Sequence, residues 1–275
     1  MRKLLLFLGL CACSPSLTSM QPARTVPAGH VQVSAALQGT PPVGAAGTAL
    51  DTVEAIDDID SRTPPARIQA LAEDAIAGLV APPSIDAHLG VAYGVSRRFE
   101  LDARIGPTGA GAGFRVQVLR KSPGIYLAIG AMLSFQYRDF ELDRFTDEAR
   151  ILNMRRMDLR VPISFGYSSS HIHVWGGPVF MHSRFSTDLN FCVRSRGGEC
   201  QSEAEVMASG SANHLAGQFG LALGKGRIWV AAELTIGRVW VNGDAELSMP
   251  RTTQTTAFSR SGTILQPALG LLTWF

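Results

Sequence analysis

The sequence lacks any long apolar run after its first ten residues, and this absence excludes most membrane architectures. No later run approaches the roughly 18 apolar residues of a membrane helix. A basic excess is also missing, because the net charge of the 275 residues is only +2, so no nucleic-acid partner is expected. Cysteine is scarce, with four residues. A chain of this kind can cross a membrane only with strands.

The N-terminus has the pattern of a secretory signal. Residues 2–3 are basic, and residues 4–10 form an apolar stretch too short to span a bilayer. The tetrapeptide Leu-Cys-Ala-Cys that ends at Cys13 resembles the lipobox of bacterial lipoproteins. The resemblance implies that residues 1–12 are removed and that Cys13 carries a covalent lipid, with no other cofactor. Ordinary signal cleavage further along the chain is the alternative.

Residues 13–29 are rich in Ser, Thr, Pro and Ala and show no apolar period. Such a composition predicts a flexible linker. The linker would join the lipid to one large β domain over residues 30–275.

Period-two alternation dominates that domain. In residues 85–95 Ile, Ala, Leu, Val and Tyr share one face, while Asp, His and Gly share the other. The same pattern returns along the chain, which predicts about ten strands with one apolar face each. Several are long enough to cross a bilayer at a tilt, which takes roughly 9–11 residues.

The composition of the polar face indicates which side points inward. It is rich in Gly and Ala with scattered charges, and Lys is nearly absent, whereas a water-exposed sheet carries more Lys, Glu and Thr. Short and long connections also alternate, as in outer-membrane barrels. We expect short turns at residues 96–98, 122–124, 168–170 and 224–226, and long outer loops at 39–84, 138–156, 185–213 and 242–261, with a Gly-rich exception at 107–113. The prediction is an all-β, closed, antiparallel transmembrane β-barrel, with a soluble lipocalin-like barrel as the alternative.

Charged and imidazole side chains on the polar face would form a network in the lumen. They are Asp86, His88, Glu100, Asp102, Arg104, Arg115, Asp158, Arg160 and Glu233. We expect the acids to pair with the arginines in a packed polar core, because ten strands are close to the size that side chains fill. The alternative is a narrow pore or a proton-sensitive gate that involves His88 or His173.

The last strand supports the membrane interpretation. A terminal Phe275, with Gly270 five residues earlier and alternating apolar positions, resembles the assembly signal of outer-membrane β-barrels; Thr273 departs mildly from it. The resemblance implies a Gram-negative outer membrane. It also implies the barrel-assembly machinery, membrane lipid and lipopolysaccharide as partners, with the lipid anchor of Cys13 on the periplasmic side.

The first long loop carries a helical signal. Residues 65–80 have apolar positions at helical spacing, and residues 49–59 are also helix-like. We expect a helical hairpin over residues 48–80 that acts as a lid, a plug or a surface element. Asp57, Asp58 and Asp60 lack the spacing of a calcium loop, so no metal site is expected.

Cys192 and Cys200 flank a short segment of the third predicted outer loop. On an oxidising side of the membrane they would form a disulfide. The arginines between them could contact lipopolysaccharide or an unknown extracellular partner.

Catalytic residues are not evident. The predicted outer rim offers titratable and hydroxyl groups, but no motif links them: Asp139, Glu141, Asp143, His182, Ser183, Asp188 and His214. His182 and Ser183 are adjacent on a strand, so their side chains point to opposite faces. We therefore expect no enzyme, but a barrel lipoprotein for envelope structure, surface interaction or narrow-pore transport. The alternatives are an outer-membrane hydrolase (protease or lipid-modifying) and a soluble periplasmic β-barrel lipoprotein.

Overall fold

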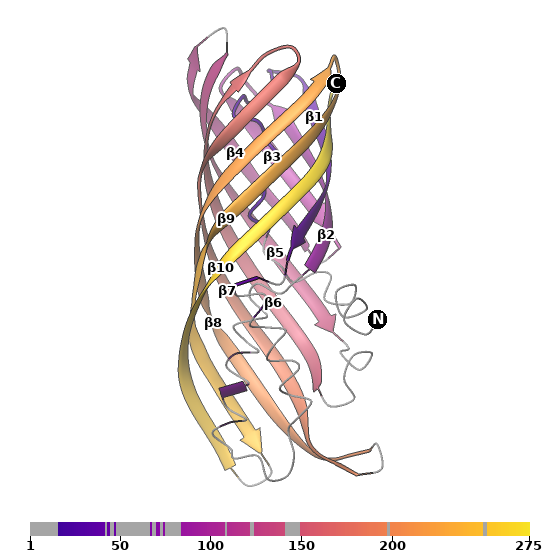
Figure 1. The fold of residues 1–275 in the computed structure, drawn as a ribbon, viewed down its shortest axis with the longest axis vertical. Coiled ribbons are helices and arrows are strands. Elements are labelled where there is room, and N and C mark those ends of the chain that lie inside the picture. Colours follow the sequence, from indigo (N-terminus) through magenta and orange to yellow (C-terminus); the bar gives the residue numbers. More distant parts are fainter. Residues whose placement is uncertain are drawn as a thin grey trace.

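The chain folds into one closed antiparallel barrel in which every strand pairs with its neighbour in sequence and β1 pairs with β10 (Figure 1). The computed structural model describes residues 16–41, 43–44, 47, 67, 70–71, 74, 84–107, 109–121, 124–140, 149–196, 199–249 and 252–275. The strands are β1 (Val31–Thr40), β2 (Ser84–Gly94), β3 (Phe99–Gly106), β4 (Gly109–Lys121), β5 (Ile125–Phe140), β6 (Ala149–Ser168), β7 (Ile172–Arg196), β8 (Glu199–Lys225), β9 (Ile228–Met249) and β10 (Thr252–Trp274). The predicted fold class and strand number are confirmed.

The two ends of the barrel differ. At one end the strands are joined by short turns at residues 95–98, 169–171 and 226–227, and β4 and β5 are joined there through a connection of which Gly124 is described; we call this the turn end. The strands β7 to β10 continue at the other end, which we call the extended end, and they project beyond the shorter β1 to β3 (Figure 1). The predicted short turns are thus all present.

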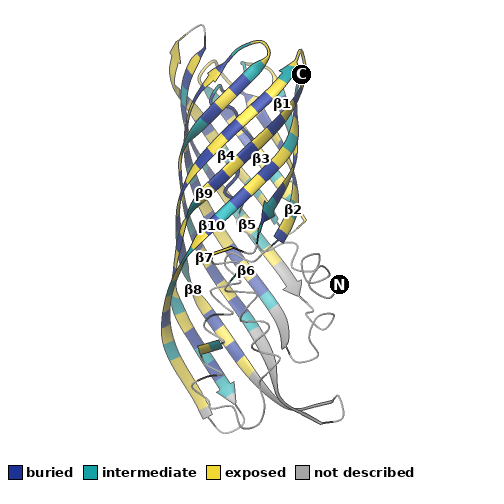
Figure 2. Cartoon of the chain, in the orientation of Figure 1, coloured by how far each residue is buried: buried dark blue, intermediate teal, exposed yellow. Residues whose placement is uncertain are grey.

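The apolar face points outward. Buried and exposed residues alternate along the strands (Figure 2), and the exposed positions carry large apolar side chains such as Leu89, Phe219 and Leu269, which are 57%, 73% and 66% exposed. None of the eight charged residues predicted for the polar face is exposed. An arginine turned toward the bilayer centre would cost about 2–4 kcal/mol, so the strand register is strongly selected.

The predicted outer loops need correction. Most of residues 185–213 and 242–261 lies in β7, β8, β9 and β10 rather than in loops. These stretches lack the alternation of apolar and polar residues, because strands that extend beyond the membrane meet water on their outer face. Polar residues such as Ser186 and Thr255 then occupy positions that are apolar further down the same strands.

The Gly-rich segment 107–113 is also mostly strand, because β4 begins at Gly109. Its glycines are typical of a turn, but here they allow β4 to pack closely against the neighbouring strand. A Cβ on Gly113 would lie 2.4 Å from the carbonyl oxygen of Ala131 on β5, so no larger residue fits there without a shift.

The helical hairpin expected at residues 48–80 lies largely outside the described residues. Within it, Arg67, Ala70, Leu71 and Asp74 are helical. The Asp74 carboxylate forms an ion pair of 2.7 Å with Arg260 of β10, which ties this part of the first loop to the extended end. Residues 1–15, with the predicted signal and Cys13, lie outside the described residues too. No helix in the described part of the chain is long and apolar enough to span a membrane.

The register of β7 and β8 does not support the predicted disulfide. Cys192 lies opposite Glu203, and Cys200 lies opposite Ser195. The two cysteines are therefore three positions out of register, which separates their backbones by roughly 10 Å along the strands. A disulfide needs Cα atoms within about 7 Å, so the pair could form only if this hairpin slipped.

Candidate functional site: an occupied lumen

A segment of the chain itself fills the lumen. Residues 16–27, which we call the plug, precede β1 and pass through the barrel without forming strand or helix. Leu17, Thr18, Met20 and Val26 are at most 1% exposed. The predicted flexible linker is therefore wrong for this segment, because the barrel wall surrounds it and binds it.

The plug runs from the extended half of the lumen toward the turn end. The Ser16 hydroxyl donates to the Gln38 side chain at 2.9 Å, close to the extended end of β1. The Val26 amide donates to the Glu100 carboxylate at 2.6 Å, and Glu100 lies opposite Gly94, the last residue of β2. The chain then turns into β1 beside that same Gly94, where the Gly29 amide donates to its carbonyl oxygen at 2.8 Å.

Glu233 of β9 is the principal anchor of the plug. Its carboxylate accepts hydrogen bonds from the Ser19 amide at 2.6 Å, the Met20 amide at 2.9 Å, the Ser19 hydroxyl at 3.0 Å and the Trp175 indole at 3.0 Å. Two successive amides converge on this one carboxylate, at a bend where Met20 adopts a left-handed conformation with φ of 48°. Backbone of this shape forms a concave site for an anion. The four donors balance the cost of burying a charge that is only 3% exposed.

Two arginines hold the carbonyl side of the same turn. Arg104 donates to the carbonyl oxygens of Thr18 and Ser19, at 2.8 Å each. Arg160 donates to the Thr18 carbonyl oxygen from across the lumen. The wall thus supplies acceptors to the plug's amides and cationic donors to its carbonyls, which satisfies a buried backbone that has no ladder of its own.

The turn end of the plug has a second anchor in Gln117 of β4. Its side-chain oxygen accepts from the Thr25 amide at 2.8 Å, and its nitrogen donates to the Ala23 carbonyl oxygen at 3.1 Å. Arg115 pairs with Glu100 at 2.5 Å and also donates to the Pro22 carbonyl oxygen at 2.8 Å.

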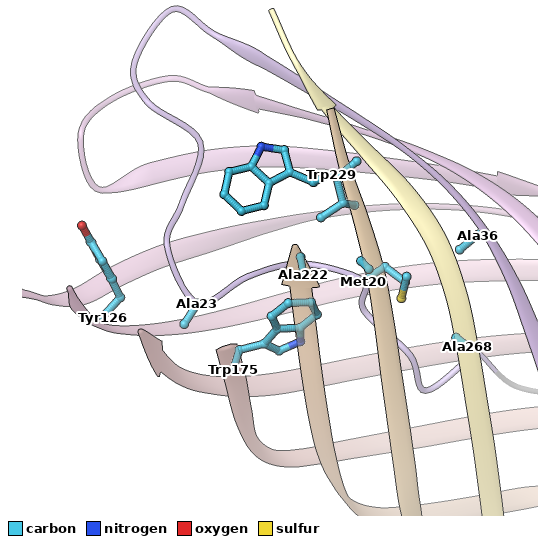
Figure 3. Close-up of a cluster of buried hydrophobic side chains, with 10 residues drawn as sticks. Met20, Ala23, Ala36, Tyr126, Trp175, Ala222, Trp229 and Ala268 are labelled. Atoms are coloured by element: carbon cyan, nitrogen blue, oxygen red, sulfur yellow. The ribbon is translucent and has the colours of Figure 1, made fainter. Parts of the chain in front are cut away.

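An apolar cluster surrounds the middle of the plug (Figure 3). Met20 and Ala23 pack among Trp175, Trp229 and small wall residues that include Ala222 and Ala268. Gly220 makes room for the Trp175 indole, since a Cβ there would lie 1.9 Å from the ring. Small residues on the inward face therefore create the space that the plug and two tryptophans occupy.

The predicted lumen residues are all on the inward side, but their partners differ from the expectation. Of the expected acid–arginine pairs, Glu100 with Arg115 is present. Asp158 instead forms an ion pair of 2.6 Å with Arg156. Arg156 belongs to the predicted loop over residues 138–156, but it lies in β6. Glu233, Arg104 and Arg160 bind the plug backbone. His88 and Asp102 are buried, and Asp86 is half-buried.

The sequence contains one signal for the plug, which is the small size of the residues on the inward face. An inward face built from Gly and Ala is too small to fill the lumen of ten strands, so a further segment was needed. The plug packs closely against the wall at Gly94, where a Cβ would lie 2.1 Å from the Pro27 carbonyl oxygen. The expected assembly-signal residue Gly270 likewise faces the Met20 side chain, 2.8 Å from the position of a Cβ.

The other two residues of the C-terminal motif lie at the closing seam of the barrel. Thr273 lies opposite Val33 of β1, and Phe275 exchanges backbone hydrogen bonds with Val31. The Phe275 side chain is 61% exposed on the outward face.

The rim residues considered for hydrolysis are not arranged as a nucleophile and base. Ser183 is buried in the lumen and accepts a hydrogen bond from Arg156 at 2.8 Å, while His182 lies on the opposite face and contacts Asn213. A guanidinium cannot take the proton from a serine hydroxyl at neutral pH. His214 is also buried in the lumen. Among the described residues, no group of three His, Cys, Asp or Glu side chains could hold a metal ion.

A closed antiparallel barrel with an apolar outside and a polar, occupied lumen defines the class of transmembrane β-barrels. No family model matches the chain, and no curated protein matches its sequence. Among solved structures it is similar to the outer membrane protein OprG from Pseudomonas aeruginosa, with 8% identity and a TM-score of 0.38, over 93% of this chain and 99% of that one. It is less similar to the CymD monoaromatic hydrocarbon channel, with 8% identity and a TM-score of 0.18, over 91% of this chain and 89% of that one. Both likenesses are too weak to carry an inference about family or function.

Proposed function

We propose that the protein is a non-enzymatic outer-membrane barrel whose lumen is closed by its own plug and conducts small solutes when the plug is displaced. The carrying observation is that residues 16–27 occupy the lumen and are hydrogen-bonded from several sides of the wall, by Glu233, Arg104, Arg160, Gln117 and Glu100. In this proposal the turn end faces the periplasm and the extended end faces outward, as short periplasmic turns and longer outer connections require.

Displacement of the plug is compatible with a stable barrel. The strands pair only with one another in a closed ring, so the wall does not depend on the plug for its backbone hydrogen bonds. The plug is bound mainly through wall side chains, which water can solvate when it leaves. A ten-stranded barrel without the plug would leave a narrow polar passage, since barrels of about sixteen strands form wide channels.

Lipidation at Cys13 with the lipid on the periplasmic side is a prediction that conflicts with the closed state of the lumen. Ser16 contacts Gln38 in the extended half of the lumen, and the three residue steps from Cys13 to Ser16 span at most about 10 Å. The stretch of β1 from Gln38 back to Val31 is roughly 20 Å long. A lipid in the periplasmic leaflet would therefore require the plug to leave the lumen. Mass spectrometry of the mature N-terminus decides whether Cys13 carries that lipid.

The alternative functions are less well supported. A soluble barrel would expose the outward apolar face to water over most of the wall, at a large cost. The hydrolase alternative has no base beside Ser183, whose hydroxyl is bound to Arg156.

Conductance across planar bilayers tests the proposal. Glu233→Gln removes the charge that binds two plug amides, so we expect the open fraction to rise at least several-fold over the wild type, because a hydrogen bond to a charged group contributes about 1.5–3 kcal/mol. Asp244→Asn is the matched control, since Asp244 lies on the same strand with an exposed side chain. Equal, near-zero currents from all three proteins would contradict a displaceable plug.

A further inference from the structure

A cavity of about 370 Å³ opens at the turn end, beside the end of the plug. It is distinct from the buried anchors described above. Plug residues, turn residues and wall aromatics line it together. The volume falls within the range of small-molecule sites.

Three flat side chains form one wall of the cavity. The His173 ring lies 4.1 Å from the Trp229 ring and 5.4 Å from the Trp274 ring, measured between centroids. The two indoles meet edge to face at 5.3 Å. Such a rigid aromatic surface binds a planar apolar group at a low cost in side-chain entropy.

Cationic and hydroxyl groups also line the cavity. Arg24 is only half-buried, so its guanidinium is available to a ligand while it lies 6.0 Å from the centre of the Tyr126 ring. Hydroxyl groups are supplied by Ser169, Ser170 and Thr25.

Basic residues predominate around the cavity. The turns and strand ends here contribute six basic residues beyond Arg24, namely Arg97, Arg98, Arg120, Lys121, Lys225 and Arg227. The four turns contain no Asp or Glu. The nearby Glu100 is already bound to Arg115 and to the Val26 amide. A ring of this kind concentrates anions at the mouth.

We propose that the turn-end cavity binds an anionic ligand that has a flat apolar face. The flat face lies against Trp274, the half-buried indole of the cavity, and the anionic group is bound by Arg24 and the hydroxyls of the turn. A small soluble anion and a phospholipid headgroup can both supply the anionic group, but the phospholipid headgroup lacks the planar face.

Occupancy of this cavity is coupled to the plug, a step that rests on the proposed function. Pro22, Arg24, Thr25 and Pro27 belong to the plug and form part of the site, so the complete site exists only while the lumen is closed. A ligand that binds only this state stabilises it by mass action. At ten times the dissociation constant, the ligand should lower the open fraction about tenfold.

Calorimetric titration with phenyl phosphate tests the binding step on full-length protein in neutral phosphatidylcholine nanodiscs. We expect phenyl phosphate to bind more tightly than inorganic phosphate or phenol, because each of these supplies only half of the chemistry. Arg24→Gln should weaken binding about tenfold or more. The control Arg97→Gln removes an exposed rim arginine that does not line the cavity and should change it little. Trp274→Leu should reduce binding of phenyl phosphate but not of inorganic phosphate.

Equal losses from Arg24→Gln and Arg97→Gln, or equal affinities for phenyl phosphate and inorganic phosphate, would overturn the site. Nanodiscs that contain phosphatidylglycerol distinguish the source of the anion. A weaker apparent affinity in them, at fixed ionic strength, would show that lipid headgroups occupy the cavity instead. Because titration reads binding and not current, a failure of the displaceable plug would leave this result unchanged.

Discussion

Trp175 connects the wall of the barrel to the anchor of the plug. Its indole nitrogen donates to Glu233 at 3.0 Å, and the same carboxylate accepts the amides of Ser19 and Met20. The ring itself is 1% exposed and depends on the absence of a side chain at Gly220. A single residue without a Cβ therefore controls the position of the group that orients the main anchor.

Gly220→Ala tests this dependence. The new Cβ would lie 1.9 Å from the Trp175 ring, so the indole must move and release Glu233. Overpacking of this kind costs about 1–3 kcal/mol, which should lower the urea midpoint of the detergent-folded protein. Gly217→Ala on the same strand is the control, because nothing lies within 4 Å of its Cβ position. Equal midpoints for the two variants would show that the indole is not held as described.

At the scale of elements, the strands were predictable and the plug was not. Alternation identifies a strand when one face meets lipid and the other meets a polar lumen, as in β5 and β9. The extensions of β7 to β10 lost that contrast because their outer face meets water. The plug has no period at all, and its Ser, Thr and Pro content is equally typical of a linker. Contacts with the wall distinguish the two, and the contacts with Glu233 and Gln117, for example, join residues more than ninety positions apart.

The charges of the lumen were placed correctly from alternation, but their pairing could not be read from it. The strand register determines which wall residues lie next to one another. The plug then binds some of these side chains, and the others pair within the wall. Arg156 was assigned to a loop, and it is this arginine that pairs with Asp158. Arg160, the expected partner, donates to Thr18.

The fit between plug and wall at the turn end gives a prediction for the plug as an element. A Cβ at Gly94 would lie 2.1 Å from the Pro27 carbonyl oxygen and 2.5 Å from that of Val26, so Gly94→Ala should push this end of the plug out of place. The bond from Val26 to Glu100 would be lost, and bilayer currents should rise. Gly39→Ala provides the comparison, since its Cβ would make only ordinary contacts near 4 Å. Unchanged currents in Gly94→Ala would argue that the turn end of the plug is not part of the closure.

At the scale of the whole molecule, a stable ring of ten strands surrounds a segment that it binds mainly with side chains. In the proposed function the ring supplies stability through strand pairing and the membrane, while the position of the plug sets whether the lumen is open. This division lets the lumen change state without unfolding of the barrel. It also links the lumen to the N-terminus, because any pull on residues before Ser16 acts on the plug.

Hydrogen exchange of individual plug amides tests the central claim most directly. In the intact barrel the amides of Ser19, Met20, Thr25 and Val26 donate to buried wall side chains, so we expect them to exchange far more slowly than an unstructured peptide. In Glu233→Gln, protection should fall at Ser19 and Met20 more than at Thr25 and Val26, which have other acceptors. Exchange of all four amides at the rate of a free linker in the folded barrel would contradict a plugged lumen.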